Sequence, residues 1–175
     1  MDSDSTVSVS CGVPVLARVD QVGILVDDIE QAVVEYSELY PVTLWRGYRY
    51  GTDTIPELGY RGGPGRLSFW VVLSDSDPQI ELIQSLEGPS IYTEWLDQHG
   101  AGFHHFGMFT KDLASDRKKL EAQGLVASQW GSGYGADGDG GFVYFDSVAQ
   151  LGMMVELIEV PARRRTPDRQ WVITR

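Results

Sequence analysis

The chain has 175 residues, of which 42% are hydrophobic, a content sufficient for the core of one domain or of two small, closely packed modules. Its formal net charge of -11 at pH 7 argues against nucleic acid as a partner, because phosphates would be repelled. No stretch approaches the roughly 18 consecutive apolar residues of a membrane span, so a membrane partner is not expected either.

Residues 1–16 are predicted to form a disordered tail. Their opening stretch, MDSDSTVSVS, is acidic and hydroxyl-rich and lacks the basic and apolar regions of a signal peptide. The single cysteine, Cys11, allows no internal disulfide and fits a reducing compartment. We therefore expect a cytoplasmic location.

The first half of the chain is predicted to form a strand, a helix and three further strands. Alternating apolar residues indicate a strand over about 17–26, and the spacing of Ile29, Ala32, Val33 and Tyr36 predicts a helix over 28–39. Further strands are expected near 43–50, 65–73 and 78–84. The glycine-rich segment 47–65 between two of these strands is interpreted as a mobile loop. A linking helix over about 89–100, closed by Gly100, then ends this half.

The second half repeats this pattern, since QVGILVDDIEQAV from Gln21 aligns with HFGMFTKDLASDR from His105. The repeat predicts a helix over 112–123 and strands over about 102–110, 125–130, 141–145 and 151–158. A second glycine-rich segment, GSGYGADGDGG, is expected to be another mobile loop. Residues 161–175, which carry the basic cluster Arg163, Arg164 and Arg165, are interpreted as a solvated C-terminal tail.

Strand alternation places four polar side chains on one concave face. These are Gln21, Glu81, His105 and Glu156, which stand at equivalent positions of the repeat. His104 is assigned to the opposite, helix-facing side. Taken singly, each polar residue fits the wet face of a one-sided sheet equally well. As a repeated set they point to a shared role.

Buried, unpaired carboxylates would cost several kcal/mol or change protonation. A divalent cation removes this cost, because two carboxylates, one imidazole and one amide oxygen form a neutral, oxygen-rich ligand set. Such a set suits Zn, Co, Ni, Mn or Mg better than a soft ion. Since only one histidine is supplied, the two-histidine set expected of an oxygen-activating iron site is missing.

Four segments, VDQVGILVDDIEQAV, IELIQSLEGPS, GAGFHHFGMFTKDL and MVELIEV, resemble the vicinal oxygen chelate superfamily over residues 17–160. That superfamily includes glyoxalase I, methylmalonyl-CoA epimerase, extradiol dioxygenases and bleomycin-resistance proteins. The resemblance implies an α+β fold in which two βαβββ modules, about 17–86 and 101–160, form a cupped, partly open β-barrel. It also implies that Gln21, Glu81, His105 and Glu156 are metal ligands, and it is compatible with a homodimer.

The ligand set is similar to that of some glyoxalases I, whereas the flanking residues are similar to those of methylmalonyl-CoA epimerases. The expected activity is that of a metal-dependent isomerase, epimerase or lyase acting on a small acid, an acyl thioester or a hydroxyketone. Glu156, and after it Glu81, is the expected base that removes a proton next to a carbonyl. The alternatives are a small-molecule binding protein of the resistance type and a ring-cleaving dioxygenase.

Five further residues are candidates for contact with the substrate. Arg66 opens a strand and suits either a substrate anion or the solvated surface. Trp70 and Tyr144 lie in strands expected to line the cup, where core packing would also explain them. Tyr48 and Tyr134 flank the two glycine-rich loops and would serve as parts of a lid.

Overall fold

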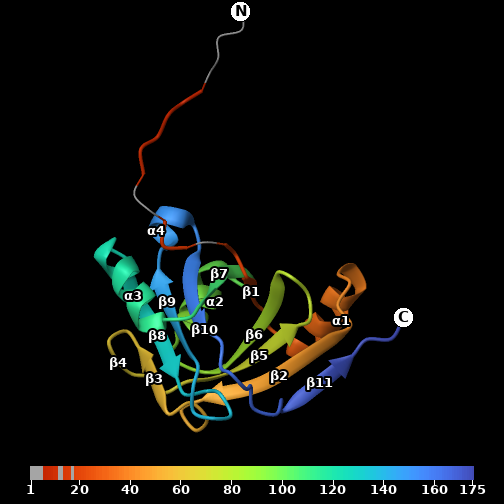
Figure 1. The fold of residues 1–175 in the computed structure, drawn as a ribbon. Helices are drawn as coiled ribbons and strands as arrows, with labels where there is room; N and C mark the ends of the chain where they lie inside the picture. Colours follow the sequence, from red (N-terminus) through yellow and green to blue (C-terminus); the bar gives the residue numbers. More distant parts are fainter. Residues whose placement is uncertain (1–5, 12–13, 17) are drawn as a thin grey trace, which may run out of the picture.

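The computed structural model describes residues 6–11, 14–16 and 18–175 (Figure 1). Residues 1–5 and 12–13 of the predicted N-terminal tail, together with Ala17, lie outside the described residues. Residues 6–11 are exposed and hold neither helix nor strand, whereas Val15 and Leu16 pack against the apolar cluster beneath the helix α3 (Leu113–Ala122).

The predicted pair of βαβββ modules is confirmed. The first contains β1 (Gln21–Leu25), α1 (Ile29–Leu39), β2 (Leu44–Gly51), β5 (Ser68–Ser74) and β6 (Gln79–Glu87). The second contains β7 (Gly102–Thr110), α3 (Leu113–Ala122), β8 (Val126–Ser132), β9 (Gly141–Asp146) and β10 (Met154–Glu159). In each module the first strand runs parallel to the last, β1 beside β6 and β7 beside β10. The modules meet through the antiparallel pair β1 and β7.

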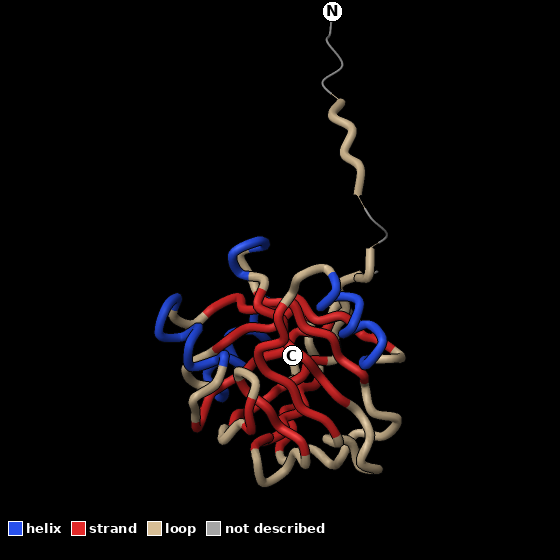
Figure 2. The backbone as a smooth tube through the Cα atoms, turned by 90° about the vertical axis from the view of Figure 1, so that its left-hand side faces the viewer, coloured by secondary structure: helices blue, strands red, loops and turns tan. Residues whose placement is uncertain are grey.

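All strands of the described residues belong to one curled sheet, in the order β11-β2-β5-β6-β1-β7-β10-β9-β8-β3-β4 (Figures 1 and 2). The helices α1 and α3 lie on its outer face, each over an apolar cluster of its own module. The Asp28 and Asp112 side chains cap these helices. The concave face holds a third, largely aromatic cluster, into which α2 (Ile91–His99) packs.

Two short elements lie where the sequence suggested a mobile loop and a tail. The hairpin of β3 (Glu57–Tyr60) and β4 (Gly63–Pro64) leaves the first module and pairs with β8 of the second. In return, β11 (Arg169–Val172) follows the second module and pairs with β2 of the first. Each module therefore covers the exposed sheet edge of the other, an arrangement that hydrophobic periodicity does not report.

A further short helix, α4 (Val148–Leu151), precedes β10. Among the described residues, no helix has the length and apolar character that crossing a bilayer requires.

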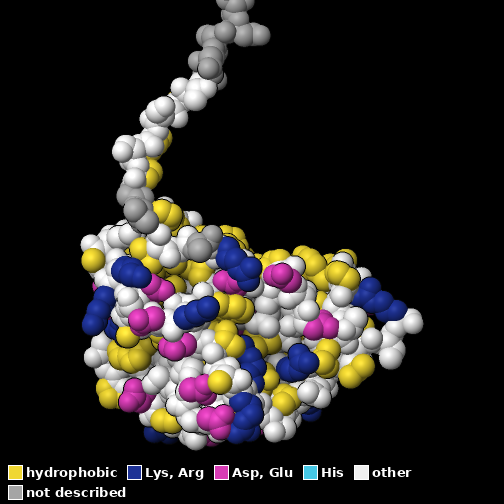
Figure 3. Space-filling view, viewed as in Figure 1, with side chains coloured by type: hydrophobic (Ala, Val, Ile, Leu, Met, Phe, Trp, Pro, Cys, Tyr) yellow, Lys and Arg dark blue, Asp and Glu magenta, His cyan; other side chains and the backbone are white. Residues whose placement is uncertain are grey.

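Acidic and basic side chains are interspersed over the face seen in Figure 3. That face therefore shows no continuous basic surface of the kind that binds nucleic acid.

Candidate metal centre and adjoining pocket

The four predicted ligands stand on the four central strands of the sheet, β6, β1, β7 and β10. Strand register arranges them in two rows that cross the sheet. In one row Gly23 of β1 lies between Glu81 and His105, and in the other Gly107 of β7 lies between Gln21 and Glu156. The duplicated modules thus bring one acid and one further ligand to each row.

The two glycines leave space for the ligand side chains. A Cβ atom on Gly23 would lie 1.7 Å from Cε1 of His105, so the imidazole lies directly over that glycine. A Cβ atom on Gly107 would lie 2.8 Å from Oε1 of Gln21. Both contacts are closer than real side chains allow. Glycine is therefore the residue that lets His105 and Gln21 lie flat across the neighbouring strand.

The histidine and the two acids converge on one small volume. Nε2 of His105 lies 3.0 Å from Oε2 of Glu156 and 3.2 Å from Oε2 of Glu81. One ligand atom from each of the three residues lies within 4.8 Å of the others, and all three side chains are buried. This buried Glu-His-Glu group could hold a metal ion.

A cation fits the donor atoms that the site leaves unpaired. Oε1 of Gln21, Oε2 of Glu81, Nε2 of His105 and Oε2 of Glu156 are all buried, and none makes a hydrogen bond of acceptable geometry with the described residues. The carboxylate oxygens are near Nε2 but do not lie along its N–H direction. Since buried polar atoms nearly always find partners, four orphaned atoms at one place are compatible with the binding of a cation.

Gln21 supports this interpretation through its other amide atom. Its Nε2 donates a hydrogen bond of 3.0 Å to Oε1 of Gln79. That bond occupies the nitrogen and leaves the oxygen of Gln21 buried over Gly107 without a partner. The amide oxygen is the atom that a cation binds.

The electrostatics of the site follow from its burial. Burial alone would lower the pKa of His105, but the carboxylates of Glu156 and Glu81 outweigh it and raise this pKa to about 9. Burial, reinforced by the charge of Glu81, raises the pKa of Glu156 to about 7, although the nearby His105 opposes the shift. Without a cation the site therefore retains protons near neutral pH.

His104 lies against the helix α2, which corrects its assignment to the face beneath α3. The register of β1 and β7 slips after Gly23, which pairs with His105 while Ile24 pairs with Phe103. This bulge leaves His104 without a partner on β1 and turns it toward the concave side, as bulges do. Its ring contacts Trp95 and Tyr92 of α2, at centroid distances of 4.9 and 5.7 Å.

His104 also contacts the candidate metal centre directly. Its Nδ1 lies 3.0 Å from Nδ1 of His105. If Nε2 of His105 is free to bind a cation, Nδ1 of His105 carries the proton and donates it to His104. Burial, together with the neighbouring His105 and His99, lowers the pKa of His104 well below its ordinary value, so it is neutral and can accept. In that state His104 would set the tautomer of His105.

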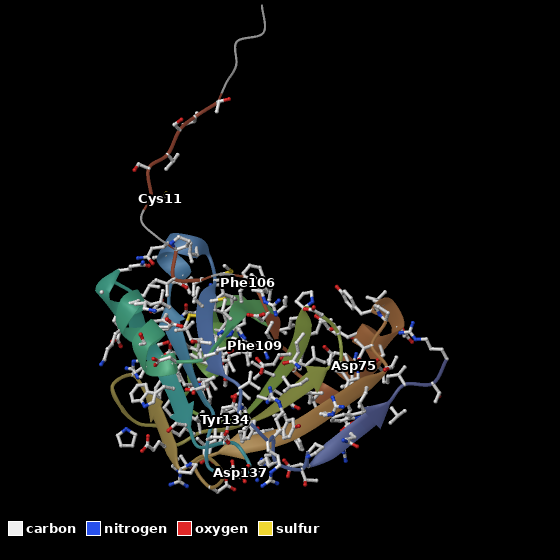
Figure 4. All side chains as sticks on the ribbon, in the orientation of Figure 1. Cys11, Asp75, Phe106, Phe109, Tyr134 and Asp137 are labelled. Atoms are coloured by element: carbon white, nitrogen blue, oxygen red, sulfur yellow. The ribbon has the colours of Figure 1, made fainter. Side chains whose placement is uncertain are left out.

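A pocket with largely aromatic walls adjoins the acids. Two of the five substrate candidates, Tyr144 and Tyr134, line it. Tyr144 stands with its ring 5.1 Å from that of His105, edge to face. Tyr134 belongs to the loop after β8, at the same end of the cup as Asp137 (Figure 4). Its hydroxyl donates to the carbonyl of Glu159 at 3.1 Å.

The other three candidates lie elsewhere. Tyr48 is buried within the concave cluster and stacks on Tyr50, with 5.8 Å between the ring centroids. It therefore packs behind a residue that lines the pocket. Trp70 packs against the cluster beneath α1, because Phe69 and Val71 take the concave face of β5. Arg66 precedes β5 and has an 87% exposed side chain that pairs with Glu87 at 3.3 Å.

Comparison with known proteins identifies the architecture. Residues 20–145 match the model of the Glyoxalase/Bleomycin resistance protein/Dioxygenase superfamily. The chain belongs to this superfamily. The sequence matches none of the curated proteins with which it was compared.

Several solved structures are similar to this chain in fold, although their sequence identity to it is low. A hypothetical protein of Bacillus halodurans C-125 is similar with a TM-score of 0.59 at 15% identity, over 85% of this chain and 98% of its own. A Streptomyces coelicolor methylmalonyl-CoA epimerase bound to 2-nitronate-propionyl-CoA has a TM-score of 0.59 at 20% identity, over 84% of this chain and 99% of the epimerase chain. A Mycobacterium tuberculosis methylmalonyl-CoA epimerase has a TM-score of 0.58 at 19% identity, over 87% of this chain and 94% of the epimerase chain. At these identities the likeness shows the fold.

In this member of the superfamily, sequence reasoning missed one charged residue of the pocket. Arg164 lines the pocket together with the acids, although its segment was interpreted as a solvated tail. No periodicity marks it, because it lies in an irregular segment and reaches the pocket only through β11 and its pairing with β2. The run of three arginines was the only available signal.

Proposed function

We propose that the chain is a metal-dependent isomerase, epimerase or lyase that removes a proton from the carbon next to a carbonyl group. The observation that carries this proposal is the set of four orphaned, buried donor atoms of Gln21, Glu81, His105 and Glu156 beside an aromatic pocket. The superfamily membership and the epimerases of the same fold support it.

The four side chains would hold one divalent cation of the group Zn, Co, Ni, Mn and Mg. Such an ion supplies Lewis acidity, which stabilises the negative charge that develops on a substrate carbonyl oxygen. The single imidazole disfavours oxygen activation, because the second histidine, His104, turns its Nδ1 to His105 rather than to the acids.

Glu156 is the proposed base. It lines the pocket in which a substrate would bind, and a carboxylate positioned there can accept a proton from the substrate. Glu81 lines the same pocket and is the second candidate. The surrounding ring of buried tyrosines, Tyr92 and Tyr144 among them, excludes water from the transferred proton.

Proton exchange tests the proposal without knowledge of the natural substrate. Purified protein is assayed for bound metal, and α-proton exchange of carbonyl compounds in D2O is followed by NMR with the metal-loaded and the chelator-treated protein. We expect exchange only with the metal-loaded form. Glu156→Gln should reduce the exchange rate by about 10²- to 10⁴-fold at saturating metal, the usual contribution of a general base. Glu57→Gln, on the exposed β3, is the matched control.

Two results would contradict the proposal. One is the absence of bound metal after purification and after incubation with each of the five cations. The other is full exchange by Glu156→Gln when it is as fully loaded with metal as the wild type. A ligand affinity that does not change when a chelator is added would instead favour the alternative of a small-molecule binding protein.

A further inference from the structure

The segment 161–168 joins β10 of the second module to β11 on the edge of the first. Hydrogen bonds fix it at both ends. Near its start, the amide of Ala136 donates to the carbonyl of Arg163 at 2.9 Å, and the amide of Ala162 donates to Asp139 at 2.7 Å. At its end, the Asp168 amide donates to the carbonyl of Gly47 at 2.9 Å. We call residues 161–168 the connecting strap.

The three consecutive arginines of the connecting strap have different partners. Arg163 donates to the carboxylate of Asp137, with Nε 3.2 Å from Oδ2. Arg165 pairs with Asp168 at 2.8 Å and places its guanidinium over the ring of Tyr50 at 4.9 Å. Arg164, between them, is half-buried and lines the pocket, and it makes no ion pair or hydrogen bond with the described residues. The side chains of both neighbours are thus paired, whereas Arg164 is left for another partner.

A second unpartnered donor lines the same pocket. The hydroxyl of Tyr50 is buried, in a residue that is only 5% exposed, and it makes no hydrogen bond with the described residues. Arg164 and Tyr50 line the same pocket. Burial raises the pKa of Tyr50 to about 12, although the charges of Arg164 and Arg165 oppose the shift. At neutral pH the hydroxyl is therefore protonated and able to donate.

The charges of the pocket indicate what these donors bind. With a divalent cation in place, Glu81 and Glu156 are neutralised, and Gln21 and His105 add no charge. Arg164 then leaves one positive charge unbalanced beside largely apolar walls that include Phe69, Val71 and Ile158. A guanidinium and a hydroxyl suit the two oxygens of one carboxylate.

We propose that Arg164 and the hydroxyl of Tyr50 form a carboxylate subsite, so that the substrate is a monoanionic carboxylic acid with an apolar body and a carbonyl group. This assignment rests on the proposed function above, which it narrows from small acids, thioesters and hydroxyketones to acids. The carbonyl end would face the metal centre, and the carboxylate would face the connecting strap.

Calorimetry with paired probes tests the subsite. The probes are 4-oxopentanoate, 5-oxohexanoate and the methyl ester of each, titrated into the zinc-loaded full-length protein. We expect the wild type to bind at least one acid about 10- to 100-fold more tightly than its ester, the usual range for a hydrogen bond to a charged group. Arg164→Gln should abolish this preference, and Tyr50→Phe should reduce it several-fold.

Arg163→Gln is the matched control, since it removes the same charge one residue away and outside the pocket. It should retain the full preference for the acid. Zinc content and circular dichroism of each variant verify folding, and the conservative change Tyr50→Phe keeps the test valid if Arg164→Gln is unstable.

Four results would overturn the assignment. They are no preference for either acid in the wild type, an unchanged preference in Arg164→Gln, an equal loss in Arg163→Gln, and tighter binding of inorganic phosphate than of both acids. The readout is binding alone. Failure of the subsite is therefore distinguishable from failure of the proposed function, which is measured by α-proton exchange in Glu156→Gln.

Discussion

At the scale of single residues, the ionisation of His105 and Glu156 governs when the site can bind a cation. Both must lose their protons to become ligands. The pKa of His105 is raised to about 9 and that of Glu156 to about 7, so metal binding must displace protons below these values. We expect metal affinity to fall as the pH decreases below about 9, and to fall more steeply below about 7.

This dependence is measurable as an apparent zinc dissociation constant at pH values between about 6 and 9.5, on either side of both pKa values, with a competing chelator corrected for its own protonation. The two groups titrate as a coupled pair, so the curve describes the pair rather than either residue. An affinity that stays constant over this range would show that the pair is already deprotonated without the metal.

His104 contacts the proposed metal centre through His105. Its neutral Nδ1 accepts the proton that His105 must carry on Nδ1 when Nε2 binds a cation. Removing this acceptor with His104→Phe should weaken zinc binding by about 10- to 100-fold, as is usual for the partners of metal ligands. His104→Gln, which retains an acceptor, should restore part of the affinity. Equal affinity in His104→Phe and the wild type would assign the histidine a packing role alone.

At the scale of secondary-structure elements, the glycines of β1 and β7 matter as much as the ligands. Gly23→Ala would place a methyl group on the imidazole of His105, and the ring would have to leave its position. We expect a destabilisation of about 1–3 kcal/mol from overpacking, together with a loss of zinc affinity. Urea unfolding and metal analysis measure the two effects.

Gly63→Ala is the control for this substitution, because a Cβ atom on Gly63 would meet no atom within 4 Å. It tests whether the added side chain matters when no ligand lies over the glycine. Wild-type zinc affinity in Gly23→Ala would mean that the imidazole of His105 does not need the space above Gly23 to bind the cation.

The elements that sequence reasoning predicted are those whose side chains repeat with a fixed period. Ile80 and Leu82 alternate with Glu81 on β6, and Val155 and Leu157 alternate with Glu156 on β10. The alternation within each strand, together with the internal repeat of the sequence, therefore placed the two acids on one concave face. The same alternation misplaced His104, whereas Trp70 follows the core packing that was the alternative given for it. In β5 the aromatic Phe69 takes the concave face, and in β7 a bulge interrupts the period.

What the sequence could not predict depends on contacts between distant segments. In the sequence, the hairpin of β3 and β4 has the composition of a glycine-rich loop, and β11 has that of a charged tail. Both become strands only through hydrogen bonds to distant segments, β3 to β8 and β11 to β2. Arg164 reaches the pocket only because the connecting strap is held by Asp139 and Asp168. None of these pairings leaves a local pattern in the sequence.

At the scale of the whole molecule, the proposed metal centre lies across the junction between the modules. Gln21 and Glu81 belong to the first module, and His105 and Glu156 belong to the second. A bound cation would therefore join the two halves at the β1–β7 pair, and unfolding of either half would release it. Metal binding should stabilise the entire fold rather than one module.

The size of this stabilisation can be predicted. Free zinc at about 100 times its dissociation constant should add about 2.7 kcal/mol to the free energy of unfolding. For a chain of this length, that corresponds to a rise in Tm of about 5–10 °C, which scanning calorimetry resolves. Glu156→Gln should lose most of this shift, whereas Glu57→Gln should retain it. If a chelator leaves the Tm of the zinc-incubated protein unchanged, or if the two modules unfold in separate transitions of which only one responds to zinc, the cation does not join the halves.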